Sequence, residues 1–287
     1  MSGQLYLLPC PISEAPALDA LPASTVETAR RIDHFLVEAA RTARATLKAM
    51  GHPKPIAELD IVEIGHDPAP ELISEWLQPV LDGADAAVLS ESGCPGVADP
   101  GAQIAARAHE LGIRVVPLTG PSSILLTLMA SGLDGQRFRF SGYLPKHDAE
   151  RRAAILAAEK ASRASETQLF IETPYRNTAL LDALLETLAP DTRLTVAIDV
   201  TGQNESIRTL TAAAWKAIPK AMRTLPKLPT VFAFLANPGN RAPRYAPECA
   251  GGKRAHTAPS SKPAVFNNRP KQANKTHRPE GSPVKTL

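Results

Sequence analysis

The first half of the chain alternates short apolar runs with longer segments in which apolar side chains recur every three to four residues. Short runs are typical of buried strands, and the longer spacing is typical of amphipathic helices. The pattern predicts strands at 4–8, 34–37, 60–64, 86–90 and 113–117, and helices at 41–50, 70–81, 102–111 and 124–129. Strands that alternate with helices in this way indicate βαβ units and a parallel sheet.

The pattern changes after a turn-rich stretch at 131–135, Ser-Gly-Leu-Asp-Gly. Beyond it, strands are predicted at 138–143, 168–172, 193–200, 205–210 and 230–235, and helices at 149–163, 175–188 and 212–218. We therefore expect an α/β protein with two α/β domains, residues 1–131 and 136–236, followed by a tail at 241–287. No internal repeat is evident.

Charge separates this tail from the rest of the chain. Residues 241–287 contain ten Lys or Arg and two acidic residues, so the tail carries a formal charge of +8 and residues 1–240 carry −5. The tail also holds seven prolines and few aliphatic residues, which favours disorder because little apolar surface can be buried. A basic tail can bind nucleic acid or a membrane surface by charge, and it can equally be a solvated appendage.

Composition narrows the class of protein further. No apolar run approaches the ~18 residues of a transmembrane helix, and the N-terminus lacks the basic-then-apolar pattern of a signal peptide. The three cysteines, Cys10, Cys94 and Cys249, have no CxxC spacing, and the seven histidines show no ligand-like pairing with them. We expect a cytoplasmic protein without a metal.

Three predicted loops follow strands and carry the residues most suited to ligand binding. The loop at 90–101, Ser-Glu-Ser-Gly-Cys-Pro-Gly-Val-Ala-Asp-Pro-Gly, is rigid and lets a ligand approach the backbone closely. Loops at 9–13 and 117–123 also follow strands, and Ser122 or Ser123 is positioned to cap the next helix. In open α/β sheets, ligands bind at the carboxyl ends of the strands. The nucleotide motifs GxGxxG and GxxxxGK[ST] and the GxSxG elbow are absent.

Taken in order, these segments resemble the tetrapyrrole-methylase-like class of S-adenosylmethionine (SAM) methyltransferases, and within it most closely the branch that methylates a cytidine 2′-hydroxyl of 16S rRNA. The resemblance covers about residues 3–236. Its motifs SDAGTPGxSDPG, PGPSA with the following SGL, FxGFLP[RK], FxE[ST]PxR and ExxRGxL are matched at 90–101, 119–123 with 131–133, 140–146, 170–176 and 205–210.

The resemblance implies two α/β domains with SAM between them, commonly in a homodimer, and rRNA or the small ribosomal subunit as the partner. The implied cofactor shell is Pro9, Cys10, Ser90, Glu91, Gly93, Cys94, Gly120, Pro121, Ser122, Ser123, Thr173, Pro174 and Tyr175. Glu38 and Arg41 match the acidic AEDTR motif and are the candidates for acceptor handling, with Glu38 as base or anchor. Arg176 and Arg208 are candidate phosphate or carboxylate binders, and Glu172 can instead form an ion pair with Arg176 one turn on.

Some positions depart from the family pattern and keep alternatives open. The AEDTR motif is Val37-Glu38-Ala39-Ala40-Arg41 here, PTPIGN is Pro9-Cys10-Pro11-Ile12-Ser13-Glu14, and Glu91 replaces the Asp of SDAG. The lost polar groups near Glu38 put the rRNA substrate in question. The alternatives are methylation of a small molecule such as a tetrapyrrole, or SAM binding without catalysis.

Overall fold

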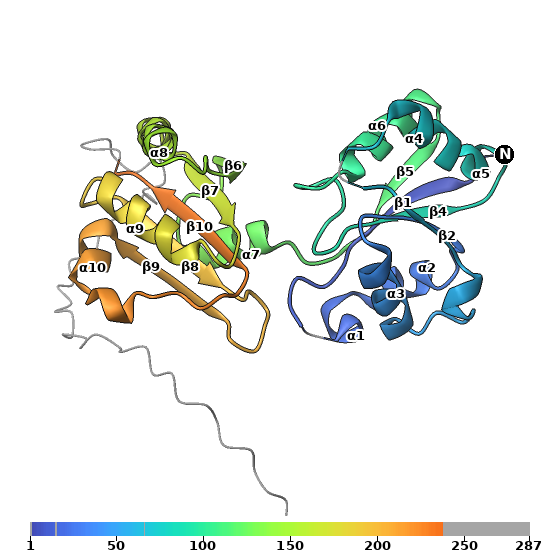
Figure 1. Ribbon diagram of the computed structural model, residues 1–287, viewed down its shortest axis with the longest axis horizontal. Coiled ribbons are helices and arrows are strands. Elements are labelled where there is room, and N and C mark those ends of the chain that lie inside the picture. The colour runs from blue at the N-terminus through green and yellow to red at the C-terminus, as the bar shows by residue number, and fades with distance from the viewer. Residues whose placement is uncertain (1, 15, 66, 238–287) are drawn as a thin grey trace, which may run out of the picture. The chain divides into compact units, whose positions relative to one another are not determined.

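The computed structural model describes residues 2–14, 16–65 and 67–237. Its first sheet contains five parallel strands in the order β3-β2-β4-β1-β5 (Figure 1). The strands are β1 (Gln4–Leu8), β2 (His34–Val37), β3 (Asp60–Glu63), β4 (Ala86–Leu89) and β5 (Arg114–Pro117). The parallel sheet predicted for this half is confirmed.

Helices cover both faces of the first sheet. They are α1 (Ala17–Ala20), α2 (Ala23–Ala29), α3 (Ala40–Ala49), α4 (Pro70–Trp76), α5 (Gln78–Leu81) and α6 (Gly101–Glu110), with a 3₁₀ turn at Ile56–Glu58. Alternate strand residues point to opposite faces, so Phe35 and Val37 of β2 pack with α2 and α3, whereas Leu36 packs with α4 and α6. Because helices cover both faces of this sheet, β2 and β4 are buried along their whole length. Strands buried on both faces are typically continuous apolar runs, as the sequence predicts for these two.

The second sheet is mixed and has the order β6-β7-β10-β8-β9. Its strands are β6 (Phe138–Tyr143), β7 (Thr167–Glu172), β8 (Arg193–Ile198), β9 (Ser206–Thr211) and β10 (Thr230–Leu235). Only β6 and β7 pair in parallel; the other pairs are antiparallel.

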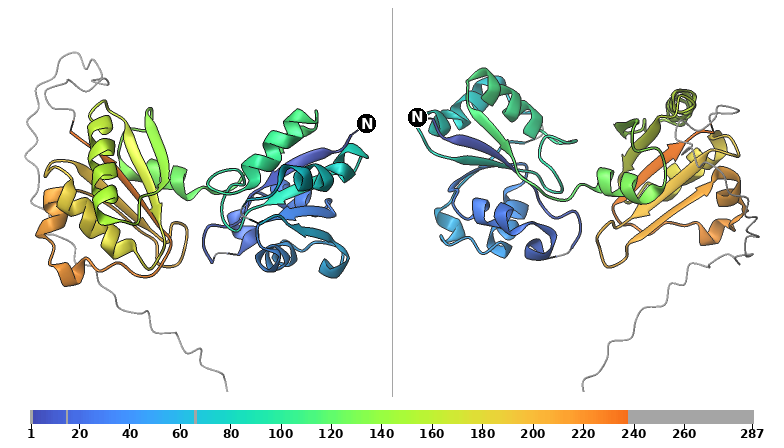
Figure 2. Two further views of the ribbon diagram at one scale, coloured as in Figure 1. Left: turned by 45° about the horizontal axis from the view of Figure 1, so that its top comes forward. Right: turned by 180° about the vertical axis from the view of Figure 1, so that it is seen from behind.

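Helices also lie on both faces of the second sheet. They are α7 (Ser123–Ser131), α8 (Asp148–Ser162), α9 (Asn177–Thr187) and α10 (Ala212–Ala217), with a 3₁₀ turn at Lys220–Met222. Helices α8 and α9 lie side by side over one face, as the views in Figures 1 and 2 agree. Phe232 and Phe234 of β10 face them, whereas Val231 and Ala233 pack with α7 on the opposite face. Thus α7, which precedes the expected boundary at 131–135, packs on the second sheet.

The elements largely follow the hydrophobic pattern, with two differences. The single helix predicted at 70–81 is wrong: α4 ends at Trp76 and α5 begins at Gln78, with Pro79 in its first turn. A proline lacks the N–H that would continue the first helix. The short helices α1 and α2 are not predicted by the pattern, because their four and seven residues are fewer than the ~11–18 over which helical periodicity is recognised.

The described residues, between 2 and 237, fall within one compact unit by their contacts. The division into domains at 131–136 stays a prediction, and the disorder expected for 241–287 concerns residues outside the described ranges. Among the described residues, no helix combines the length and apolar character needed to cross a membrane.

Candidate functional site

Four loops meet at one edge of the first sheet because the strands are parallel. The loops after β1, β2, β4 and β5 all leave from the carboxyl ends of their strands. Strands β1 and β4 are neighbours at the centre of the sheet, with β2 and β5 on either side. This is the edge at which open α/β sheets bind ligands, and it brings together the three loops singled out in the sequence.

Backbone contacts tie these loops to one another. Cys10 and Gly93 form an isolated antiparallel bridge, with the Cys10 N–H donating to Gly93 O at 2.9 Å and the Gly93 N–H donating to Cys10 O at 3.2 Å. The Glu91 N–H donates to Glu38 Oε2 at 3.3 Å, which joins the loops after β2 and β4. The Cys94 thiol donates to Pro121 O at 3.4 Å and joins the loops after β4 and β5.

The loops after β1 and β5 are also in close steric contact. A Cβ atom at Gly120 would lie 2.3 Å from Pro9 Cβ and 2.7 Å from Pro9 Cγ, so glycine is required for this approach. The next turn ends at Ser122, which caps α7 as predicted: its Oγ accepts the Leu125 N–H at 3.5 Å. The fixed loop therefore leads directly into a helix N-terminus.

Asp99 organises the second half of the loop after β4. Its Oδ1 accepts the backbone N–H groups of Gly96 at 2.6 Å and Gly101 at 2.8 Å, while its buried Oδ2 has no hydrogen-bond partner among the described residues. Burial raises the pKa of Asp99, and the two backbone donors oppose that rise. The neighbouring Ala98 has a positive φ of 66°, a strained conformation of the kind found at ligand-binding loops.

The two thiols of the site are protonated at neutral pH. Burial, together with the charge of Asp99, raises the pKa of Cys10 to about 12. The same two causes raise the pKa of Cys94. Since only a thiolate is a good nucleophile, both cysteines act as structural groups in these loops.

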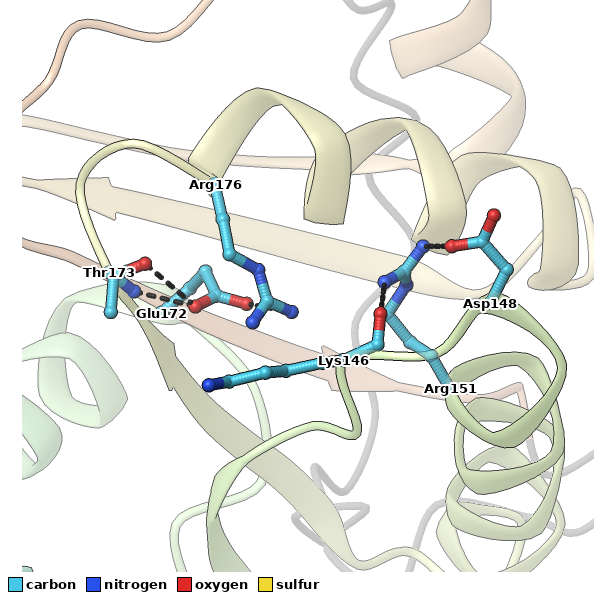
Figure 3. A network of polar contacts seen from close by, with 6 residues as sticks. All are labelled: Lys146, Asp148, Arg151, Glu172, Thr173 and Arg176. Carbon is cyan, nitrogen blue, oxygen red and sulfur yellow. Dashed lines mark hydrogen bonds and ion pairs between the residues drawn. The ribbon is translucent and has the colours of Figure 1, made fainter.

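A polar network lies at the carboxyl end of β7 in the second sheet (Figure 3). Glu172 Oε1 accepts the Thr173 N–H at 2.7 Å and the Thr173 hydroxyl at 3.2 Å, and Arg176 Nη2 lies 3.0 Å from Glu172 Oε2. The ion pair of Glu172 with Arg176 is thus present, and the Glu172 side chain is only 1% exposed. Beside it, Arg151 donates to the Lys146 carbonyl at 2.9 Å and pairs with Asp148. The contacts of Glu172 fix the loop from β7 into α9, and those of Arg151 fix the loop from β6 into α8.

Two neighbouring cavities open at these loops. The first has a volume of about 350 Å³ and is lined by Ile12, Glu38, Glu91, Ser92, Val97, Ala98, Asp99, Ser123, Ile124, Tyr143, Ile171, Glu172, Thr173, Pro174, Val200, Pro229, Thr230 and Val231. The second has a volume of about 450 Å³ and is lined by Pro11, Ile12, Ser13, Glu14, Glu91, Ser92, Asp199, Gln203, Asn204, Lys227, Leu228 and Pro229. Both volumes fall within the usual range for small-molecule sites.

The sequence-predicted residues divide into lining and supporting groups. Those lining the first cavity are Glu38, Glu91, Ser123, Thr173 and Pro174. Others lie in the loops without lining either cavity: Pro9, Cys10, Ser90, Gly93, Cys94, Gly120, Pro121 and Ser122. Ser90 belongs to this group because its buried hydroxyl donates to Gly93 O at 3.1 Å.

Three predicted residues lie elsewhere. Arg41 is exposed in the first turn of α3, outside both cavities. Tyr175 is exposed and lines neither cavity, although the two preceding residues line the first. The Arg208 guanidinium lies 5.5 Å from the Trp215 ring centroid, a cation–π contact within the second half.

Sequence reasoning missed the apolar lining of the first cavity. Ile12, Val200 and Val231 come from three distant segments, and they pack in one cluster with residues of α7. Nothing in the local sequence distinguishes such residues from ordinary core positions. Within the described part of the chain, no group of three or more His, Cys, Asp or Glu is placed to hold a metal.

Comparison with known proteins agrees with this arrangement. The family model described as Tetrapyrrole (Corrin/Porphyrin) Methylases matches residues 17–215. A protein of Mesorhizobium japonicum named Ribosomal RNA small subunit methyltransferase I is 33% identical over 210 residues, which cover 73% of this chain and 68% of that protein. A protein of the same name from Neisseria meningitidis serogroup B is 29% identical over 201 residues, covering 70% of this chain and 65% of the relative, just under two thirds of its length.

Solved structures show the same fold at low sequence identity. A diphthine synthase structure has a TM-score of 0.58 at 17% identity and covers 82% of this chain and 90% of that one. A structure of the methyltransferase CobJ has a TM-score of 0.54 at 16% identity, and the match covers 84% of this chain and 97% of CobJ. The family model matches most of the described residues, and a relative with 33% identity is covered over 68% of its length: this chain belongs to the tetrapyrrole (corrin/porphyrin) methylase family.

Proposed function

We propose that the protein is a SAM-dependent methyltransferase that modifies ribosomal RNA, with a ribose 2′-hydroxyl of 16S rRNA as the acceptor. The observation that carries the proposal is the cavity at the strand ends, which combines acidic side chains with an apolar wall in a chain of the methylase family. The rRNA substrate rests on the relatives named Ribosomal RNA small subunit methyltransferase I. A cytoplasmic homodimer is part of the same proposal.

The residues of the first cavity fit SAM by charge and by shape. SAM carries a sulfonium and an ammonium group, and Glu91 and Asp99 place carboxylates around the cavity. Carboxylates stabilise such cations more strongly in a partly buried site than in water. The apolar wall suits the adenine ring, and Ser123, at the start of α7, offers backbone N–H groups that suit a carboxylate. When bound, SAM supplies an electrophilic methyl group.

The chain's own contribution is mainly to orient the acceptor. Holding two reacting groups at near-attack distance is worth roughly 7–11 kcal/mol, and the bridged loops provide a rigid frame for it. Glu38 is the proposed base or anchor for the acceptor hydroxyl: it lines the cavity, and its Oε2 is held by the Glu91 N–H. Arg41, exposed on the helix that follows, is the proposed phosphate contact.

SAM binding is tested by calorimetric titration of the full chain with SAM and with S-adenosylhomocysteine, which lacks the sulfonium charge. We expect 1:1 binding, and we expect Glu91→Gln to weaken SAM more than S-adenosylhomocysteine. Glu71→Gln is the matched control, because Glu71 is exposed on α4 and lines neither cavity. No heat and no thermal shift with either ligand would exclude a SAM site.

The substrate is tested by labelling with tritiated SAM in an extract from a strain that lacks this protein. We expect label in the small-subunit rRNA. Label in small metabolites instead would support methylation of a molecule such as a tetrapyrrole. Binding of SAM without any labelled product would support a SAM-binding protein without catalysis.

A further inference from the structure

Tyr175 is an aromatic side chain that the fold leaves in solvent. It is 80% exposed, although it follows Thr173 and Pro174, which line the first cavity. The Glu172 network fixes the start of this loop, so the position of Tyr175 is set by a rigid segment. An exposed ring held at the rim of a cavity offers a flat surface to a ligand.

A lysine from a distant part of the chain lies over this ring. Lys227 Nζ is 5.2 Å from the Tyr175 ring centroid, and Lys227 lines the second cavity. The two cavities share lining residues, among them Glu91 and Pro229, so they are neighbouring compartments. Lys227 therefore connects the exposed Tyr175 ring with the second cavity, which adjoins the proposed methyl-transfer site.

The segment that ends at Lys227 is rich in basic residues. The segment from 216 to 227, Lys-Ala-Ile-Pro-Lys-Ala-Met-Arg-Thr-Leu-Pro-Lys, contains four basic residues and no acidic one. Lys216, Lys220 and Lys227 are exposed, and Arg223 is half-buried. Asp182 pairs with two of them: Lys220 Nζ lies 3.3 Å from Asp182 Oδ2 and Arg223 Nη1 lies 4.0 Å from Asp182 Oδ1. In Figure 1 this segment connects α10 with β10. A cation beside an exposed aromatic ring, as Lys227 lies beside Tyr175, with further basic residues in the same segment, is a combination that binds single-stranded nucleic acid.

We propose that Tyr175, Lys227 and the second cavity bind a nucleotide that flanks the methyl acceptor in the RNA. This inference rests on the proposed RNA substrate and assigns Tyr175 to RNA rather than to SAM. The base stacks on the Tyr175 ring, and the Lys227 ammonium, on its flexible stem, binds the adjacent phosphate. The basic segment 216–227 follows the RNA backbone.

The acidic residues of the second cavity fit a base and exclude a phosphate. Glu91 and Asp199 line the cavity together with the amide side chains of Gln203 and Asn204. Carboxylates accept hydrogen bonds from exocyclic amino groups of bases, and amides pair with base edges. Phosphates are repelled by the carboxylates and stay at the rim, where Lys227 lies. The charge distribution thus keeps the phosphate beside Lys227 and turns the hydrogen-bonding edge of the base that stacks on Tyr175 toward the second cavity.

The test compares Tyr175→Ala, Tyr175→Phe and Lys227→Gln with the wild-type chain. The probe is a fluorescein-labelled single-stranded RNA oligonucleotide, with binding followed by anisotropy over a range of salt concentrations. Lys160→Gln is the matched control, because Lys160 is exposed on α8 and lines neither cavity. SAM titration of each variant and methyl transfer to small ribosomal subunits are measured on the same preparations.

We expect Tyr175→Ala to weaken RNA binding by roughly 5- to 150-fold, the usual effect of losing one stacked base, and Tyr175→Phe to retain most of the affinity. Lys227→Gln should lower the slope of log affinity against log salt by about 0.7, the value for one phosphate contact to a single strand. SAM affinity should not change in any variant.

The inference is overturned if Tyr175→Ala binds the RNA as the wild type does, if it loses SAM affinity, or if Lys160→Gln matches Lys227→Gln. A wild-type chain that binds SAM and methylates RNA while these variants behave normally refutes this inference alone. A wild-type chain without SAM binding refutes the proposed function instead.

Discussion

Replacing Gly120 by alanine tests the contact that holds the loops after β1 and β5 together. The new Cβ atom would lie 2.3 Å from Pro9 Cβ and 3.2 Å from Leu21 Cδ2. Pro9 belongs to a bridged, buried loop and has a ring that cannot rotate away. Overpacking of this kind costs about 1–3 kcal/mol, and for a unit of this size it would lower Tm by about 2–12 °C.

Gly135→Ala is the control for this experiment. No atom lies within 4 Å of the Cβ position at Gly135, and neither Gly135 nor Gly120 has a positive φ. Alanine at an unstrained glycine position usually stabilises a protein by about 0.4–1 kcal/mol, through the unfolded chain. The two variants should therefore change stability in opposite directions in urea unfolding followed by circular dichroism.

A double variant, Pro9→Gly with Gly120→Ala, makes the test specific because it removes both proline atoms that approach the new methyl group. The loss of unfolding free energy in the double variant should be smaller than the sum of the losses in the two single variants by about 1 kcal/mol or more. If Gly120→Ala is as stable as Gly135→Ala, or if the double variant shows no coupling, the steric reasoning is wrong.

Three further variants test the site. Arg176→Ala leaves the buried Glu172 carboxylate without its cation and should cost about 2–3 kcal/mol in urea unfolding, below the fully buried case because Arg176 is 31% exposed; Glu172→Gln should offset part of that loss. Asp99→Asn keeps the Oδ1 acceptor but removes the negative charge of the Asp99 carboxyl group, whose pKa is raised by burial. The folded state binds that proton more tightly than the unfolded state, so wild-type stability falls as pH rises above about 3.9. Asp99→Asn should therefore have a higher free energy of unfolding than the wild type at pH 7. A difference between the two that grows as the pH is lowered would contradict this reasoning. Glu38→Gln should spare SAM binding and slow methyl transfer by ~10²–10⁴-fold if Glu38 is the base; a wild-type rate would place the acceptor elsewhere.

The sequence predicts the strands well because each is a short apolar run that the sheets bury. Every predicted strand is present, with shifts of one or two residues at the ends. The pattern predicts one helix at 70–81 because its apolar period continues through Pro79, whereas the missing proline N–H divides it. Local periodicity thus locates elements better than it locates breaks within them.

The loops of the candidate site could be predicted from the sequence, whereas the apolar residues that line its cavity could not. Glycine and proline mark the loop at 90–101 because the backbone there needs unusual conformations. Val200 and Val231, by contrast, line the cavity only because the second sheet brings them beside Ile12. The approach of Lys227 to Tyr175 has the same origin, since the two residues are far apart in the chain. Such pairings depend on tertiary structure, which no local pattern encodes.

Within the described residues both sheets are open, so each ends in edge strands whose outer backbone groups another strand could pair with. Each edge carries a feature that discourages this. Strand β5 ends in Pro117, β3 carries Asp60 and Glu63, and β6 has an irregular register near Gly142, where φ is +63°. At the other edge, β9 carries Arg208. Charges, proline and irregular pairing are known protections against edge-to-edge aggregation, so these edges disfavour strand-by-strand association although neither sheet closes into a barrel.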